Sequence, residues 1–215
     1  MNDIIVSLPG FLQGALNTMG LTIFGILIGL TFGMIIALGR LSHHIVPNKI
    51  AQFYVWFFRG TPLMLQIFLI YYALPEISPI SIPMFPAGFV ALGLNSAAYL
   101  AEIIRGAIQS IDKGQMEASR ALGMSYGQAM RVIIIPQSYR RLIPPVGNEF
   151  IALLKDSSLV SVMGLTELLR TTTQLNSTTG GNPIYFVPCM VFYLVLTSLF
   201  TFLFSRLEKK YSAYE

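Results

Sequence analysis

Long apolar stretches dominate the chain, and each is long enough to cross a membrane as a helix. A membrane-spanning helix needs about 20 mostly apolar residues. Residues 4–39 carry no charged side chain, and residues 18–38 are their best window for a first span. Further spans are predicted at residues 50–74, 87–107 and 184–205. A signal peptide is the alternative for the first stretch, but its apolar core is short and follows a basic start, so a retained span is favoured.

The second span is expected to be broken near its middle. Residues 59–62 read Arg-Gly-Thr-Pro. Proline lacks a backbone donor and disfavours a helical conformation at the residue before it, so a kink or a re-entrant turn is predicted here. A stiff external loop follows, with prolines at Pro75, Pro79, Pro83 and Pro86.

A weaker fourth span is predicted at residues 142–162. Hydropathy alone would reject this stretch because it carries Pro144, Pro145, Glu149, Lys155 and Asp156. A charged, proline-interrupted helix persists at membrane depth only where it faces protein or a water-filled cavity. Neighbouring helices or a partner subunit are therefore expected to cover it, which makes five spans in all.

The composition agrees with a membrane protein. The 215 residues are 54% hydrophobic and only 11% charged, whereas soluble domains average about 25% charged residues. A soluble enzyme and a disordered protein are thereby excluded. The lone Cys189 allows no disulfide framework or cysteine-based metal cluster, and the His43-His44 pair has no carboxylate near in sequence, so no metal site is predicted. Residues 1–215 are expected to form a single domain without internal repeats.

The basic residues predict the orientation. The stretches after the first, third and fifth spans hold Arg40, Lys49, Arg105, Lys113, Arg120, Arg131, Arg140, Arg141, Arg206, Lys209 and Lys210. The opposite loops hold only Lys155 and Arg170. The positive-inside rule places the amino terminus outside and the carboxyl terminus inside, which requires an odd number of spans. Five spans satisfy this condition.

A short amphipathic helix is predicted in the inner segment after the third span, at residues 114–123. Met116 and Leu122 give it an apolar face and Glu117 a polar one. Gly123 can end it, because glycine readily adopts the left-handed conformation that closes a helix. By its physical properties alone, such a helix could simply lie on the lipid surface.

The spacing in this segment resembles the EAA motif of ABC importer permeases. That motif has E-A-A, three residues, G, nine residues and then I-x-L-P. This chain matches the motif with Glu117-Ala118-Ser119, Gly123 and residues 133–136 (Ile-Ile-Ile-Pro). Ser119 and Ile135 are conservative departures from it. Residues 58–63, 101–106 and 155–159 resemble the polar amino acid subfamily, the permeases for histidine, glutamine, arginine and their relatives. The resemblance extends from about residue 14 to residue 206.

The resemblance implies the membrane subunit of an importer that takes up polar amino acids by alternating access, with basic amino acids as a candidate substrate class. The segment 114–123 would be the coupling helix that binds a separate ATPase subunit. The coupling residues it implies are Gln115, Glu117, Ala118, Ser119, Leu122 and Gly123. Because the chain lacks the phosphate-binding pattern G-x-x-x-x-G-K-[ST], ATP and Mg would be bound by the ATPase, and this chain would need no cofactor and would not itself be an enzyme.

The other partners implied are a second permease copy or a homologue, an extracytoplasmic substrate-binding protein and the lipid bilayer, with no nucleic acid. The implied location is a prokaryotic plasma membrane.

Polar side chains on two spans are the candidate substrate ligands. Asn95, Tyr99 and Glu102 fall on one helical stripe of the third span, and Glu149 and Asp156 share a face of the fourth. Ionisable groups inside spans are costly and point to function. Carboxylates on two facing helices could bind an ammonium or guanidinium group, and Asn95 and Tyr99 could add neutral hydrogen bonds.

A helix break is expected directly after these carboxylates, at residues 155–158. Its free helix end, with Ser157 and Ser158, could bind the carboxylate of an amino acid. The structural alternatives stay open at this stage. Glu102 could pair with Arg105, Asp156 could pair with Lys155 or Arg59 or cap the next helix, and Glu149 could be a buried strut.

Other interpretations remain for the outer loop and for the function. Residues 171–182 are expected to be a polar external loop, either a linker or a docking surface for the binding protein. An ATP-independent secondary carrier would leave the EAA-like segment unexplained. A non-transporting membrane anchor for an ATPase would have no use for carboxylates inside its spans.

Overall fold

The computed structural model describes the backbone of residues 2–212 and the side chains of residues 7–211, and this part of the chain is helical without strands. The first half contains α1 (Asn2–Leu41), α2 (Ile45–Gly60), α3 (Leu63–Phe68), the π-helical turn η1 (Leu69–Ala73), α4 (Leu74–Ile77) and α5 (Met84–Gln109). The second half contains α6 (Lys113–Ala121), α7 (Tyr126–Ala129), η2 (Met130–Ile134), α8 (Ile135–Asp156), η3 (Ser157–Met163), α9 (Leu168–Thr178), η4 (Pro183–Tyr185) and α10 (Phe186–Ser212). The predicted all-helical class is confirmed.

Three described helices are long and apolar enough to cross a membrane, namely Ser7–Leu41, Met84–Gln109 and Pro183–Tyr211. A fourth candidate is the pair Ile45–Gly60 and Leu63–Ile77, and the two helices are bent by 106° relative to each other at the break. The break predicted at residues 59–62 therefore lies where the two halves of the second span join. α8 carries too many polar residues to qualify by hydropathy, so the five-span count stays a prediction.

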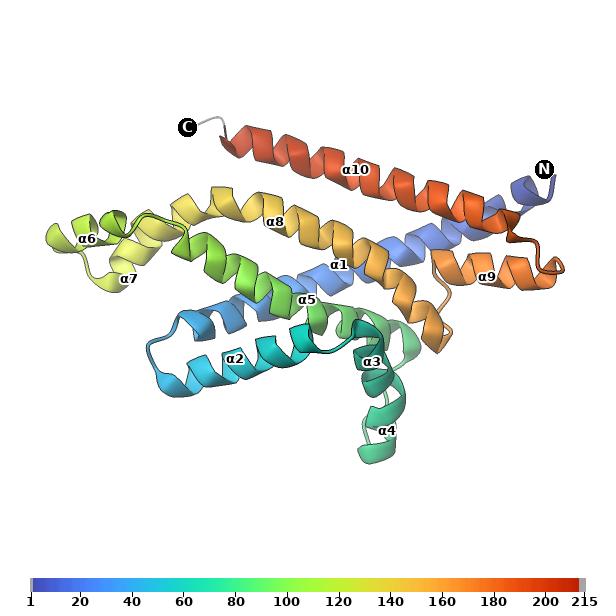
Figure 1. Cartoon of the computed structure of the whole chain (residues 1–215), viewed down its shortest axis with the longest axis horizontal. Coiled ribbons are helices and arrows are strands. Elements are labelled where there is room, and N and C mark those ends of the chain that lie inside the picture. Colours follow the sequence, from blue (N-terminus) through green and yellow to red (C-terminus); the bar gives the residue numbers. More distant parts are fainter. Residues whose placement is uncertain (1, 213–215) are drawn as a thin grey trace.

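The helices α1 and α5 form the centre of the bundle, with α8 and α10 on one side and α2 on the other (Figure 1). Small residues permit the close approach of α1 and α5. A Cβ atom built on Gly93 would lie 2.6 Å from Cβ of Ile28, and one built on Gly33 would lie 3.1 Å from the carbonyl oxygen of Ala97. Small residues serve this purpose in membrane helices because lipid gives apolar side chains little reason to associate.

The two ends of the bundle differ in what they contain. The α1–α2 turn, α6, α7 and the carboxyl end of α10 lie at one end, and the amino end of α1 and α9 lie at the other (Figure 1). The basic residues that the sequence assigns to the inner side lie on the first group of elements or on the helices that lead into it, α2, α5, η2 and α8. Much of α10 is exposed, including Met190 and Leu194, as expected for a helix that faces lipid or a partner subunit.

The expectation of a polar loop at residues 171–182 is wrong over most of its length, because α9 occupies Leu168–Thr178. The carboxylate of Glu167 accepts hydrogen bonds from the backbone amides of Leu169 and Arg170, 2.8 and 2.6 Å long, and so caps the helix. The hydroxyls of Thr171 and Thr172 are buried and donate to carbonyls one turn earlier. Polar residues that suggest a loop thus form hydrogen bonds with the backbone of their own helix.

We predict that Gly93→Ala lowers the stability of the bundle by about 1–3 kcal/mol, the usual cost of overpacking, because the added methyl group collides with Ile28. Gly106→Ala is the matched control on the same helix, since nothing lies within 4 Å of its added Cβ atom. Thermal unfolding in detergent measures both variants. Equal unfolding midpoints for the two variants would contradict the close α1–α5 contact.

Candidate functional site

The break between α2 and α3 is held together by one buried amide, Gln66. Its Nε2 donates to the carbonyl oxygens of Phe58 and Thr61, at 2.9 and 3.1 Å, and to the Thr61 hydroxyl at 2.8 Å. Helix ends leave backbone carbonyls unpaired, and at membrane depth no water reaches them unless a cavity does. The Gln66 side chain therefore satisfies the end of α2 from inside the protein.

Asn95 ties the same break to α5. Its Nδ2 donates to the Phe58 carbonyl at 3.2 Å and to the Gln66 Oε1 at 2.9 Å. Asn95 and Gln66 are both buried. The break is thus a fixed feature of the bundle, attached to its central helix.

A cavity of about 340 Å³ lies beside this break. It is lined by Thr61, Pro62, Leu63, Asn95, Tyr99, Glu149, Ala152 and Asp156. Four of the predicted substrate ligands, from α5 and α8, therefore face one space. The polar linings come from three separate segments, which is how a ligand can be surrounded on several sides.

The carboxylates of the cavity are not neutralised by an ion pair among the described residues. The Ser96 hydroxyl donates to Oε1 of Glu149 at 2.6 Å, which orients this carboxylate from α5. Asp156 forms no salt bridge with Lys155 or Arg59 in the described structure, and its side chain does not cap η3. The guanidinium carbon of Arg59 lies 5.1 Å from the centre of the Tyr99 ring, so this cation stacks on a wall of the cavity.

Glu102 lies outside the cavity, in an ion triad near the α1–α2 turn. Arg40 Nε is 2.9 Å from its Oε1, and Arg105 Nη2 is 2.6 Å from its Oε2. The triad joins the end of α1 to α5. Glu102 thus has the arrangement of a structural ion pair, the alternative that the sequence left open.

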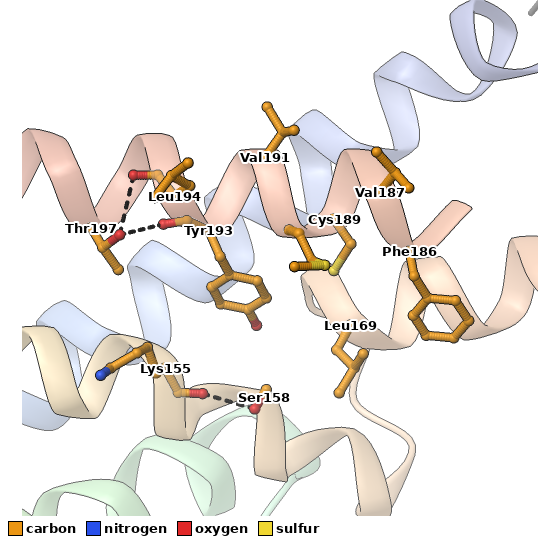
Figure 2. A pocket seen from close by; sticks show the side chains of 11 residues that line it. Lys155, Ser158, Leu169, Phe186, Val187, Cys189, Val191, Tyr193, Leu194 and Thr197 are labelled. Carbon is orange, nitrogen blue, oxygen red and sulfur yellow. Dashed lines mark hydrogen bonds between the residues drawn. The ribbon is translucent and has the colours of Figure 1, made fainter. Parts of the chain in front are cut away.

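The two serines after α8 also lie outside the cavity. Ser157 is buried, and its hydroxyl donates to the Leu154 carbonyl at 2.7 Å. Ser158 donates to the Lys155 carbonyl at 2.7 Å and, with Lys155, borders a separate groove between α8 and α10 (Figure 2). That groove has a volume of about 810 Å³ and is mostly apolar, with Val187, Met190 and Leu194 among its linings. The expected unwound break at residues 155–158 is not found, because α8 changes directly into the 3-10 helix η3 at Ser157 and the hydroxyls bond to the preceding turn.

The predicted coupling segment forms α6, which begins and ends with defined caps. Asp112 accepts a hydrogen bond of 2.7 Å from the backbone amide of Gly114. Gly123 has φ +84°, and the amide of Met124 donates to the Ser119 carbonyl at 3.1 Å. This left-handed closure is the one for which glycine is suited.

The six residues implied in coupling share this helix and its end. Gln115, Glu117, Ala118 and Leu122 are exposed, and Leu122 has 83% of its surface accessible. Ser119 is buried and donates to the Gln115 carbonyl at 2.6 Å. Leu122 is therefore an apolar side chain that stands open at the end of a polar segment.

Sequence reasoning missed Gln66 and Ser96 as residues that support the cavity. Gln66 is a polar side chain in the second half of a predicted span, and a polar group there needs a partner. That signal was present in the sequence. The pairing of Ser96 with Glu149 depends on the crossing of α5 and α8, which the sequence does not reveal.

Residues 29–213 match the family described as the binding-protein-dependent transport system inner membrane component, and the chain belongs to this family. It is therefore the membrane-spanning permease subunit of an ABC importer, located in the bacterial plasma membrane.

Curated relatives cover nearly the whole chain. The arginine transport system permease protein ArtQ of Bacillus subtilis (strain 168) is 39% identical over 209 residues, which are 96% of this chain and 94% of ArtQ. The glutamine transport system permease protein GlnP of Escherichia coli (strain K12) is 36% identical over 205 residues, 95% of this chain and 94% of GlnP.

Solved structures share the fold. A chain of an amino acid ABC transporter crystallised with histidines has a TM-score of 0.92 and 40% identity, and the match covers 96% of both chains. A chain of the inward-facing MetNI methionine ABC transporter has a TM-score of 0.72 at 22% identity over 97% of both chains. At that identity, the second likeness concerns the fold alone.

We predict that Glu102→Gln lowers the stability by about 1–3 kcal/mol, because two guanidinium groups lose a charged partner. The side chains are partly exposed, so solvent screening keeps the loss moderate. Substrate preference should not change, because Glu102 lies outside the cavity. Thermal unfolding and uptake assays measure the two effects, with Glu76→Gln, an exposed glutamate on α4, as control. A change of preferred substrate at unchanged stability would contradict the structural role.

Proposed function

We propose that this chain imports polar amino acids with basic side chains, as one of two permease subunits driven by separate ATPase subunits. The observation that carries the proposal is the cavity at the α2–α3 break, where Glu149 and Asp156 face a space together with Asn95 and Tyr99. Neither carboxylate forms an ion pair within 4 Å among the described residues, and ionisable groups at membrane depth are costly unless a ligand, water or another charge compensates them.

The cavity offers different groups to the two ends of a basic amino acid. Glu149 and Asp156 can accept hydrogen bonds from a guanidinium or ammonium group, the strong charge-assisted kind. Asn95 and the Tyr99 hydroxyl can bond to neutral parts. Arg59 is not among the lining residues but stacks on Tyr99, and in this proposal its charge attracts the substrate carboxylate. ArtQ, described as an arginine permease, supports a basic substrate, whereas GlnP, described as a glutamine permease, is the competing precedent.

The proposed topology has five spans, with the amino terminus outside and the carboxyl terminus inside. It makes α8 the fourth span. Phe150, Leu153 and Leu154 of α8 are buried in the core, while Glu149 and Asp156 on another face line the cavity. The arrangement of basic residues at one end of the bundle supports the orientation.

We propose that α6 is the coupling helix and that α8 transmits its motion. After η2, the chain continues as α8. This helix has 22 residues and, at about 1.5 Å per residue, spans roughly 33 Å. This helix begins beside the coupling segment and ends at the cavity carboxylates. Gln137 of α8 also donates to Gln115 of α6 at 3.3 Å. A displacement of α6 would therefore move Glu149 and Asp156 through α8.

The proposed assembly supplies what this chain lacks. ATP and Mg are bound by the ATPase subunits. The α6 helix of each permease subunit docks in a groove on one ATPase subunit, as in other helix-in-groove contacts. A second copy of the chain or a homologue completes the membrane part. A substrate-binding protein delivers the amino acid to the outer end, where α9 lies.

We predict that Asp156→Asn and Glu149→Gln each lower the ATP-driven uptake of arginine, expressed as kcat/KM, by about tenfold or more, since each removes a charge-assisted hydrogen bond. Liposomes containing the chain, its ATPase subunits and the binding protein provide the measurement. Glu76→Gln is the matched control and an inactive ATPase sets the background. Uptake of glutamine alone, with arginine ignored, would contradict a basic substrate.

We predict that Gly123→Asp and Glu117→Lys leave the permease folded but uncouple ATP hydrolysis from uptake. A side chain at Gly123 is strained at φ +84° and would distort the end of α6. Gly127→Asp is the matched control, because Gly127 lies in open space without a positive φ. Rates of hydrolysis and of uptake are compared in the same liposomes. Normal coupling in both test variants would refute the role of α6.

A further inference from the structure

We propose that the inner ends of α8 and α10 form a binding site for an anionic phospholipid. The site would hold the phosphate of the headgroup and the first part of an acyl chain. It is separate from the substrate cavity and does not depend on which solute is carried. It depends on the proposed topology, in which this end of α10 meets the inner membrane surface.

The site is a cavity of about 680 Å³ between the two helices. It is lined by Pro136, Tyr139, Arg140, Ile143, Leu207 and Tyr211. A tight contact between α8 and α10 closes the cavity on the side away from the inner end, since a Cβ atom built on Gly147 would lie 2.8 Å from the Phe204 ring. One turn nearer the inner end, at Ile143 and Leu207, the two helices leave room for a ligand.

The chemistry of the lining is that of an amphiphile site. Ile143 and Leu207 provide an apolar wall beside the tight contact, and Tyr139, Arg140 and Tyr211 provide polar groups toward the inner end. Tyr139, Leu207 and Tyr211 have 61%, 45% and 46% of their surface accessible. A soluble anion would gain nothing from the apolar wall, whereas a phospholipid fills both parts.

Charge complementarity favours an anionic headgroup. Arg206, Lys209 and Lys210 follow one another closely on α10, with Glu208 between them. Arg206 stacks on Phe202 with its guanidinium carbon 4.7 Å from the ring centre, and Arg141 donates to the Ser110 carbonyl. Arg140 is the basic side chain that lines the cavity itself. Basic pockets between membrane helices on the cytoplasmic side attract anionic headgroups.

A fluorescence experiment tests the site in the intact permease–ATPase complex. Trp56 is the single tryptophan of this chain, so Trp56→Phe combined with Tyr211→Trp places one reporter in the cavity. Emission of the ATPase subunits is subtracted with the Trp56→Phe complex. The complex is placed in phosphatidylcholine nanodiscs that contain increasing fractions of brominated phosphatidylglycerol or brominated phosphatidylcholine, whose bromine atoms quench a nearby indole.

We expect half-quenching at an about tenfold lower fraction of the brominated anionic lipid, the ratio that one charge-assisted contact provides. Arg140→Gln should abolish this difference, Arg140→Lys should keep most of it, and the matched Arg206→Gln should leave it intact. Four results would overturn the site. The first is equal quenching by the two lipids, and the second is an equal loss of the preference for the anionic lipid in Arg140→Gln and Arg206→Gln. The third is relief of quenching by millimolar inorganic phosphate. The fourth is quenching that is seen only after the ATPase subunits are removed.

Discussion

The break in the second span is the feature on which the rest of the site depends. A helix that stops at membrane depth exposes carbonyl oxygens, and these must be paired inside the protein because lipid offers no donors. Gln66 supplies those donors, and Asn95 connects them to α5. The 106° bend that results turns α3 away from α2 and leaves a cavity at the corner. A straight second span would fill that corner with side chains, and Glu149 and Asp156 would then have no polar space to face.

Two polar systems coexist in the bundle, and their surroundings separate their roles. Near the α1–α2 turn, the carboxylate of Glu102 lies between Arg40 and Arg105 and ties α1 to α5. In the cavity, the Ser96 hydroxyl orients Glu149, and neither Glu149 nor Asp156 forms an ion pair within 4 Å among the described residues. A carboxylate already paired with two arginines has little to offer a cationic ligand, whereas an unpaired one favours binding it. The partners therefore distinguish the structural carboxylate of Glu102 from the two proposed ligands, since all three side chains carry a carboxylate.

Much of the architecture was predictable from the sequence, because membrane spans and helix breaks depend on local composition. The four apolar spans, the break at residues 59–62 and the short helix closed by Gly123 follow from hydropathy, proline and glycine alone. The site was predictable only in part. Asn95, Tyr99 and Glu102 share a stripe, but seven residues of helix extend about 10 Å, so the far end of the stripe meets Arg40 instead of the cavity. Sequence periodicity shows which residues share a face of a helix. It does not show which element packs against each turn of that face. The helix α9 was missed for a similar reason, since its stability comes from the Glu167 cap and from buried threonines.

The central claim is that the permease itself holds a basic amino acid at the α2–α3 break. Its most direct test is equilibrium binding of radiolabelled arginine to the purified permease–ATPase complex, without the binding protein. The account predicts saturable binding that lysine displaces, that is lost when Glu149→Gln and Asp156→Asn are combined, and that persists in Glu102→Gln. Absence of saturable binding, or equal loss in Glu102→Gln and in the combined cavity variant, would contradict it.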